Sequence, residues 1–585
     1  MILRTVLFLI SLLLAGTAVW LGLNVLFADG TDWVDYVRIA LLGLTTWWIA
    51  WGAMLGLCGV FLPKPRLPPR HDGPLVTRTA ILLPVYNEPP EKPFSHAAAM
   101  MESLAATGQA RHFELAIVSD TTRPAVGAEE EAWFARLRAE FGHLMPVYYR
   151  RRTENTGKKA GNIADFIKRF GGRYDHLIIL DADSLMEGAT LVEMVRRMEA
   201  EPRLGLLQTL PKVIRSRSFF GRVLQFSAGF FSPIFTRGVA ALQGEEGPFW
   251  GHNAITRTIA FAESCGLPEL PGRPPFGGHI LSHDYVEAAL LARNGWIVRV
   301  DPDLEGSFEE APDNILDYAK RDRRWAQGNL QHSKLVGVPG LRMWNRFVFV
   351  QGIMAYLASS LWGLFLIATI VAPVFAPPYD FFPEDQLGVP VFPISEETRA
   401  LLLLLLVLGL LLGPKLMIAL RSIVDGRAKG FGGAGAVLLS VVIEILWSSL
   451  IAPLMLAFQT RSVLEVLTGA DGGWPAANRE ADAIPLKDAW AASWWIVAIG
   501  AGILAAAWFF TNLFIWFLPV GGPMLMAPLL IAWSSSGGEG QAARRLRLFV
   551  TPEEKEPTPA MNAQTRILAA WRQPAPAAPT LAAQV

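Results

Sequence analysis

Long apolar stretches divide the chain into two membrane regions separated by a polar segment. A helix needs about 20 apolar residues to cross a bilayer core. Runs of this kind lie at 2–27, 36–62, 346–373, 399–420, 434–458, 491–511 and 513–533. Residues 63–345, between the second and third runs, are far more polar. The pattern therefore predicts a multi-pass membrane protein with one large soluble insert.

The charges beside the first runs predict which side the insert faces. Three aspartates lie between residues 29 and 35, whereas Lys64, Arg66 and Arg70 follow the second run. Basic residues next to a span favour the cytoplasmic side, so we expect the insert in the cytoplasm. A cleaved signal peptide is the less favoured interpretation of the first run, because the run is long and a second span follows at once.

The fifth apolar run conflicts with a simple count of crossings. An arginine cluster at 544–547 follows the last two runs, so the end of that hairpin is also expected inside. The run at 434–458 then cannot cross once, and it contains Glu444 and Pro453, which are costly in lipid. We interpret 422–460 as an interfacial or re-entrant segment. An ordinary span there remains the alternative.

The remaining boundaries follow from composition. A Pro-rich linker at 63–75 leads into the soluble domain, and the tail is rich in Pro and Ala, which predicts that it is largely disordered around a short helical pattern at 561–571. The expected parts are two transmembrane helices at 1–62, the linker, the soluble domain at 76–345, transmembrane helices at 346–421, the segment at 422–460, a polar segment at 461–490, a transmembrane hairpin at 491–533 and a tail at 534–585.

Strands and helices alternate within the insert. Short apolar strands followed by polar turns are predicted at 79–84, 114–120 and 176–181, with helical patterns at 95–107, 128–141 and 160–170. This alternation is typical of a doubly wound, Rossmann-like α/β sheet, which binds ligands at the carboxyl ends of its strands.

Each predicted strand ends in polar side chains. Asn87 and Glu88 follow the first strand, Asp120 follows the second, and Asp181 and Asp183 follow the third. One acid after a strand is usually a helix cap, but three strand ends with acids favour a binding site. Two carboxylates one residue apart suit a hard divalent ion that shares its coordination with substrate phosphates.

Composition narrows the function. The chain has 585 residues, 52% hydrophobic and 18% charged, and its net charge is zero, so no nucleic-acid partner is expected. Cys58 and Cys265, the two cysteines, form neither a disulfide framework nor a metal cluster. The first strand lacks a following Gly-x-Gly-x-x-Gly and the chain lacks a P-loop, which argues against a dinucleotide enzyme and an ATPase.

The motifs, in their order, resemble those of processive family-2 membrane glycosyltransferases, which include cellulose, chitin and hyaluronan synthases. The segments that carry the resemblance are 84–88, 119–120, 158–162, 181–183, 247–253, 282–284 and 323–329. Within this group the chain most resembles the branch that makes osmoregulated periplasmic glucans, over essentially residues 1–535. The resemblance implies a GT-A domain inserted in a polytopic α-helical domain of the bacterial inner membrane. It also implies inverting transfer of glucose from UDP-glucose to a growing β-1,2-linked glucan.

The resemblance assigns roles residue by residue. The donor would be bound by Asn87, Glu88, Asp120, Lys159, Asn162 and Asp181, and Mg²⁺ or Mn²⁺ by Asp181 and Asp183. The acceptor would contact Phe249, Trp250, Gly251, His252, Arg321, Arg324, Trp325 and Gln327. Asp284 would be the general base that accepts the proton of the sugar hydroxyl. Structural roles remain the alternatives for two of these residues. Asp284 is then an acid at the start of a helix, and Trp325 is an anchor at the membrane interface.

Two positions depart from the usual family pattern. Arg321 stands where the acceptor motif usually has Gln, and Ser282-His283 replaces Thr-Glu before the aspartate. Both departures resemble the periplasmic-glucan branch, so donor chemistry transfers more directly than linkage. His252 and His283 are not favoured as metal ligands, because no His-x-x-x-His or paired Cys accompanies them.

The resemblance also indicates binding partners and a gating loop. Membrane lipid, acyl carrier protein and periplasmic glucan-processing proteins are the expected partners beside the donor and the glucan. The segment at 461–490 is placed where related synthases carry a gating loop, although a plain linker is an alternative. The spans after Trp325 favour translocation of the product. A transferase that adds one sugar to a lipid carrier, and a non-enzymatic transporter or sensor, are the other functions considered.

Overall fold

The computed structural model describes residues 2–28, 30–63, 67–376, 381, 390, 396–470, 483–511 and 513–572. Parts of four predicted segments therefore lie outside the described residues. They are 64–66 of the linker, most of the loop between the third and fourth spans, 471–482 of the segment expected to gate the site, and 573–585 of the tail.

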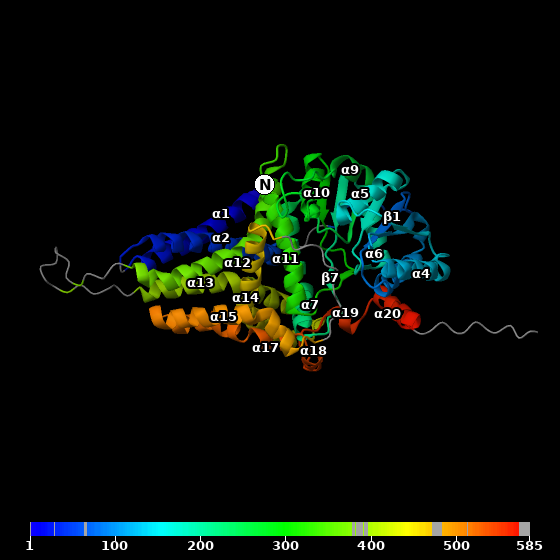
Figure 1. The fold of residues 1–585 in the computed structure, drawn as a ribbon. Helices are drawn as coiled ribbons and strands as arrows, with labels where there is room; N and C mark the ends of the chain where they lie inside the picture. Colours follow the sequence, from blue (N-terminus) through cyan, green and yellow to red (C-terminus); the bar gives the residue numbers. More distant parts are fainter. Residues whose placement is uncertain are drawn as a thin grey trace, which may run out of the picture.

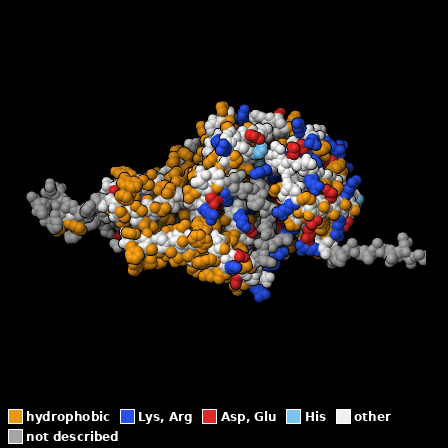
Figure 2. Space-filling view, in the orientation of Figure 1, with side chains coloured by type: hydrophobic (Ala, Val, Ile, Leu, Met, Phe, Trp, Pro, Cys, Tyr) orange, Lys and Arg blue, Asp and Glu red, His pale blue; other side chains and the backbone are white. Residues whose placement is uncertain are grey.

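Long apolar helices form one half of the molecule (Figure 1), and hydrophobic side chains cover this half in Figure 2. Within the described residues, six helices are long and apolar enough to cross a membrane: α1 (Ile2–Leu26), α2 (Trp33–Phe61), α12 (Met343–Phe375), α13 (Glu397–Val424), α14 (Ala434–Leu467) and α15 (Leu486–Phe510). A seventh candidate is the pair α16 (Phe514–Leu525) and α17 (Ala527–Ser534), which is bent by 55°. The expectation of a multi-pass protein is confirmed.

The soluble half is built on a seven-stranded sheet in the order β3-β2-β1-β4-β8-β6-β9. Its strands are β1 (Thr79–Val85), β2 (Phe113–Ser119), β3 (Val147–Arg151), β4 (His176–Ile179), β6 (Leu204–Gln208), β8 (Ala254–Arg257) and β9 (Ile297–Val300). β8 is antiparallel to both of its neighbours. A small second sheet joins β5 (Leu185–Met186), β10 (Ser307–Glu309) and β7 (Lys212–Val213).

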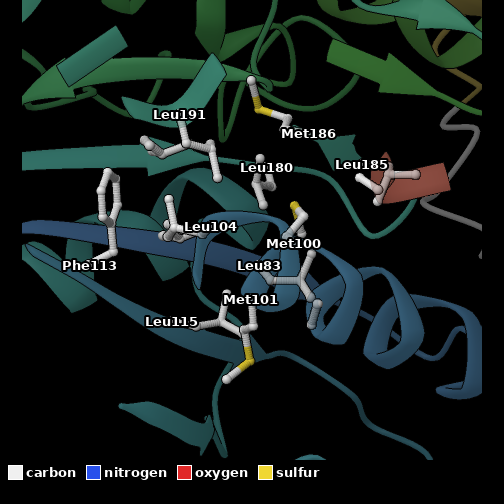
Figure 3. Packing of buried hydrophobic residues seen from close by; sticks show 14 of the residues in the cluster. Leu83, Met100, Met101, Leu104, Phe113, Leu115, Leu180, Leu185, Met186 and Leu191 are labelled. Carbon is white, nitrogen blue, oxygen red and sulfur yellow. The ribbon is translucent and has the colours of Figure 1, made fainter. Parts of the chain in front are cut away.

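Helices cover both faces of the large sheet. They are α3 (Glu91–Ala105), α4 (Pro124–Phe141), α5 (Lys158–Phe170), α6 (Gly188–Ala200), α9 (Thr258–Ser264) and α10 (His283–Arg293), with single turns at Ala110–His112 and Gly171–Arg173. Two further single turns, His332–Lys334 and Arg427–Lys429, contact the boundary and membrane helices. Successive side chains of a strand point to opposite faces. Leu83 of β1 therefore packs towards Met100 and Leu104 of α3 in one core, shown in Figure 3, whereas Leu82 belongs to a second core with Phe166 of α5. The predicted GT-A-like α/β fold is confirmed.

Three helices run across the boundary between the two halves. α7 (Phe219–Phe230), α11 (Ile315–Gln331) and α14 lie crosswise to the membrane helices in Figure 1, and α8 (Ser232–Gln243) packs against α2. The two ends of α14 both contact elements of the soluble side. Near its start, the Ser440 hydroxyl accepts a hydrogen bond from the backbone N–H of Phe549 at 3.1 Å. Near its end, Glu465 pairs with Arg323 of α11 at 2.6 Å.

The tail corrects the sequence-based expectation. Residues 537–572 are not disordered but form α18 (Gly537–Arg545), α19 (Pro552–Lys555) and α20 (Pro559–Arg572). α20 packs on α3 and contributes Ile567 and Trp571 to the main core of the soluble domain. The indole N–H of Trp571 donates to Glu140 at 2.7 Å. The helical pattern expected at 561–571 corresponds to α20, but the Pro and Ala content gave no sign that its buried residues, which recur at helical spacing, dock on the soluble domain.

Candidate active site

The three strand ends with polar side chains are neighbours, because β1 lies between β2 and β4 and all three are parallel. Asn87, in the turn after β1, has a φ of 58°. Its amide oxygen accepts hydrogen bonds from the backbone N–H groups of Thr122 and Arg123 at 3.1 and 3.0 Å. Asn87 therefore ties the turn after β1 to the turn after β2. Glu88 folds back and accepts the backbone N–H of Tyr86.

Asp120 is held by a fork of charge-assisted bonds. Both oxygens of its buried carboxylate accept from Arg152, at 2.7 Å each, and Asn162 donates to Oδ1 at 2.9 Å. Asn162 itself is only 1% exposed. Such bidentate pairs fix orientation as well as charge. Asn162 thus positions Asp120 and presents little surface to a ligand.

Asp181 lies at the centre of the site. Lys159, in the first turn of α5, pairs with Asp181 Oδ1 and donates to the backbone carbonyl of Gly251 at 2.6 Å. The Asp181 side chain is 37% exposed, whereas Asp183 is buried. The strand end and the turn at 249–253 are therefore joined through one ammonium group.

His252 adds a second cation beside Asp181. Its Nδ1 lies 3.6 Å from Asp181 Oδ2, and its Nε2 lies 2.9 Å from a carboxylate oxygen of Glu309 in β10. Burial lowers the pKa of His252, but the carboxylates of Asp181 and Glu309 outweigh burial and raise it to about 9. The imidazole is therefore charged near neutral pH.

Two residues that sequence reasoning missed hold this turn in place. Glu309 binds His252, and Gln208 at the end of β6 accepts the backbone N–H of Trp250 at 2.9 Å and donates to the carbonyl of His252 at 3.0 Å. β10 has three residues, too few for a periodic signal. Only the folded sheet brings these groups together.

Asp284 lies in the first turn of α10 and faces Gly251. A Cβ added to Gly251 would lie 3.6 Å from Asp284 Oδ2, and the φ of Gly251 is +84°, which disfavours a side chain there. Burial and the nearby Glu287 raise the pKa of Asp284, although His283 lowers it. His283 is itself paired with Glu287 at 3.0 Å. Asp284 therefore lies beside Gly251, whose carbonyl is bonded to Lys159, and Lys159 is paired with Asp181.

The candidate acceptor residues divide into exposed and buried groups. On α11, Trp325 is 42% exposed and the Arg321 guanidinium lies 4.5 Å from its ring centroid, a cation–π contact. Arg324 is half-buried and Gln327 is buried, whereas Phe249 is buried within the second core of the soluble domain. The next turn of α11 contacts the residue that precedes α10, the helix of Asp284, since the Asn329 amide lies 3.5 Å from the Ser282 hydroxyl.

A cavity of about 760 Å³ lies beside the cluster, between α5 and the segments around 261–269 and 279–287. Its lining includes Arg152, which holds Asp120, and Glu287, which binds His283, but among the described lining residues there is no candidate donor, metal or base residue, so the cavity is not the site itself. Within the described residues, no three or more His, Cys, Asp or Glu side chains form a ready-made metal site. Asp181 and Asp183 nevertheless offer the hard oxygen donors that Mg²⁺ or Mn²⁺ accepts when phosphates complete its coordination.

Comparison with known families agrees with the fold. Residues 80–264 match the model of glycosyl transferase family 2, and residues 176–414 match that of glycosyl transferase family group 2. In the solved structures, a mannosyltransferase from Pyrobaculum calidifontis in complex with GDP-Man and Mn²⁺ is similar with a TM-score of 0.45. It is 16% identical, and the match covers 74% of this chain and 99% of that one.

Curated relatives match almost the whole chain. The glucans biosynthesis glucosyltransferase H of Cereibacter sphaeroides is 55% identical over 98% of this chain and 96% of its own length. Proteins of the same name from Shewanella sp. strain ANA-3 and Vibrio cholerae are 41% and 40% identical over 90% and 94% of this chain, and over 73% and 77% of their own lengths.

The GT-A-like domain, its cluster of acids at the strand ends and the flanking apolar helices define a membrane-embedded glycosyltransferase of family 2. Within that class, the chain belongs to the glucans biosynthesis glucosyltransferase H family. The resemblance to the periplasmic-glucan branch is thereby confirmed, as is a role in glucan biosynthesis.

Proposed function

We propose that the protein transfers glucose from UDP-glucose to a growing β-1,2-linked glucan, with inversion, in the bacterial inner membrane. The observation that carries the proposal is the chain of contacts from Asp181 through Lys159 and Gly251 to Asp284. It sets a candidate phosphate site and a candidate base on either side of one glycine. The reacting sugar would then lie between a bound diphosphate and the carboxylate.

The donor side is built to hold negative charge. Lys159 and the charged His252 lie next to Asp181, where the diphosphate would bind, and they stabilise the charge that develops on leaving UDP. A divalent ion at Asp181 and Asp183 would add further positive charge to the same phosphates. Asp120 is fixed by Arg152 and offers a rigid hydrogen-bond acceptor for the N–H group of the uracil ring of UDP-glucose.

The acceptor side supplies the proton acceptor. A sugar hydroxyl is a weak nucleophile, so its proton must pass to a base as the new bond forms. A carboxylate whose pKa is raised by burial is a stronger base than an ordinary one, and Asp284 has that property. Trp325, with Arg321 on its ring, offers an exposed flat surface on which a glucose ring can stack.

The tail supports a cytoplasmic insert with both ends of the last membrane region on the same side. α20 is part of the core of the soluble domain, so the chain crosses the membrane an even number of times between α11 and α18. The described residues of this stretch contain five apolar units, and both ends of one of them, α14, contact soluble-side elements. We therefore assign α14 to the interface, and the insert to the cytoplasm by the positive-inside rule.

The test is product analysis with purified full-length protein in detergent. With labelled UDP-glucose and Mg²⁺, we expect UDP release and a polymer whose linkage analysis gives β-1,2-glucose. A single glucose on a lipid would indicate the carrier-transferase alternative. No UDP release under any metal would indicate a non-enzymatic protein. In sealed vesicles with the soluble domain outward, labelled glucan in the lumen supports translocation by the same chain, and glucan found outside alone contradicts it.

A further inference from the structure

A second cavity lies between the soluble domain and the tail, and we call it the tail cavity. Its volume is about 550 Å³, within the range of small-molecule sites. Residues from α3, from the segments 214–218 and 310–313, from the start of α18 and from α20 line it. Its charged lining consists of Lys92, Arg215, Arg217, Arg572, Glu310 and Asp313. Cations therefore outnumber acids in the lining by four to two, and one of the four, Arg572, is paired with Glu91 outside the lining.

The two acids of the lining do not balance its positive charge. Glu310 is shared, since one oxygen lies 3.0 Å from Lys92 Nζ and the other lies 3.8 Å from the guanidinium of Arg215. Asp313 accepts hydrogen bonds from the backbone N–H of Arg217 at 3.1 and 3.3 Å. The Arg217 residue is exposed at the rim. Glu310 and Asp313 thus hold the basic residues in position but do not neutralise all of their positive charge.

Arg215 is held in the cavity by an unusual backbone conformation. Its φ is 64°, a region that residues other than glycine seldom occupy and that recurs at functional sites. Its guanidinium donates only long bonds to α20, at 3.3 Å to the carbonyl of Met561 and 3.4 Å to the hydroxyl of Thr565. Burial lowers the pKa of Arg215, so an anion beside it would relieve an unfavourable environment.

We propose that the tail cavity binds a phosphate-bearing anion through Arg215, Arg217 and Lys92. Guanidinium groups match phosphate oxygens in pairs of hydrogen bonds, and lysine adds a point charge. The phosphate comes either from a soluble phosphorylated compound or from the headgroup of an anionic lipid, and the two share this chemistry.

The position of the cavity connects it to the active site. Glu310 directly follows Glu309, whose carboxylate binds His252 beside Asp181. Ala483, just after the undescribed part of the segment expected to gate the site, also lines the cavity. An anion that draws Lys92 and Arg215 away from Glu310 would therefore act on Glu309 and on the segment that begins at Ala483. Ligand binding is therefore expected to change turnover.

The first experiment measures binding of inorganic pyrophosphate to the full-length protein in neutral detergent. The donor site is disabled by Lys159→Gln and His252→Gln, which remove the cations beside Asp181, and by excess chelator, so that only other sites are titrated. We expect saturable binding that Arg217→Gln weakens by about tenfold or more, as for loss of a hydrogen bond to a charged group. Arg111→Gln, which removes an exposed arginine outside the cavity, is the matched control. Absence of saturable binding, or equal binding to both arginine variants, overturns the proposal.

The second experiment identifies the source of the phosphate and the effect on turnover. Nanodiscs of phosphatidylcholine with and without phosphatidylglycerol are compared, and competition by the anionic lipid that depends on Arg217 indicates a headgroup. Binding of pyrophosphate that is indifferent to the lipid indicates a soluble ligand. In a wild-type background, Arg217→Gln should leave basal UDP release unchanged and remove the response to whichever ligand binds. A response that persists in Arg217→Gln contradicts the assignment.

Discussion

Replacement of Asp284 by Asn separates its proposed chemical role from a structural one. Asn keeps the shape of the side chain but cannot accept the proton of the acceptor hydroxyl. We expect turnover to fall by about 10²-fold or more, the usual contribution of a positioned base. A 10²-fold loss corresponds to about 2.7 kcal/mol of transition-state stabilisation. UDP affinity should change little, because the contacts to Lys159 and Asp120 are untouched.

The stability of the same variant has a predicted sign. Burial raises the pKa of Asp284, so the folded protein holds this proton more tightly than the unfolded chain does. Between the ordinary pKa of aspartate and the raised one, stability therefore falls as pH rises, and the ionised group costs stability at neutral pH. Asn carries no charge. Asp284→Asn should consequently melt at the same temperature as the wild type or higher.

The assay combines UDP release, UDP binding and thermal melting of purified protein. Activity of the wild type should rise with pH as Asp284 loses its proton, and the residual activity of the variant should lack that step. Asp488→Asn is the matched control, because Asp488 is an exposed acid in the first turn of α15. If UDP affinity collapses in step with turnover, Asp284 belongs to the donor site. A lower melting temperature would instead favour a helix-start role.

Three further substitutions test the rest of the site and the tail. Asp183→Asn should abolish UDP release while the melting temperature is maintained, and full activity in that variant or in excess chelator would contradict the metal role. Trp325→Ala should shorten the glucan more than it weakens UDP binding, whereas lower stability with normal product length would indicate an anchor. Trp571→Ala should lower the free energy of unfolding by up to about 5 kcal/mol, since a buried Trp is lost from the core, and an unchanged melting temperature would show that the tail is not docked in solution.

The parts of the site that could be predicted are those encoded in consecutive residues. Each strand is an apolar run that ends in a polar turn, so the amino-acid sequence alone puts Asn87, Asp120 and Asp181 at one sheet edge. The parallel neighbours β2, β1 and β4 bring them together as expected. Helix starts near 91, 124 and 158 also lie within a few residues of the predicted patterns.

The supporting partners could not be predicted in the same way. Arg152, Gln208 and Glu309 bind Asp120, Trp250 and His252 from elements distant in sequence, and ordinary polar residues carry no local sign of such pairing. The docking of the tail on the soluble domain could not be predicted for another reason. The helical pattern at 561–571 was expected within a tail whose composition indicated disorder, but the free energy of docking comes from a few buried side chains that recur on one helix face.

Glu444 shows how an inference can rest on an incomplete reason. The cost of a carboxylate in lipid argued against a crossing at α14, yet Glu444 is only 3% exposed and pairs with Lys415 at 2.8 Å, so protein satisfies it in either topology. The parity of crossings set by the docked tail is the stronger argument, because it does not depend on how one side chain is solvated.

An interfacial α14 also has a use in the proposed reaction. Its Gln459 donates to the buried carboxylate of Asp322 at 2.8 Å and bonds Ser359 of α12. This polar chain links a membrane helix to α11, the helix that carries Trp325. A helix that lies along the boundary can brace α11 over two contacts, at Asp322 and at Arg323, and so fix the acceptor surface relative to the path of the product.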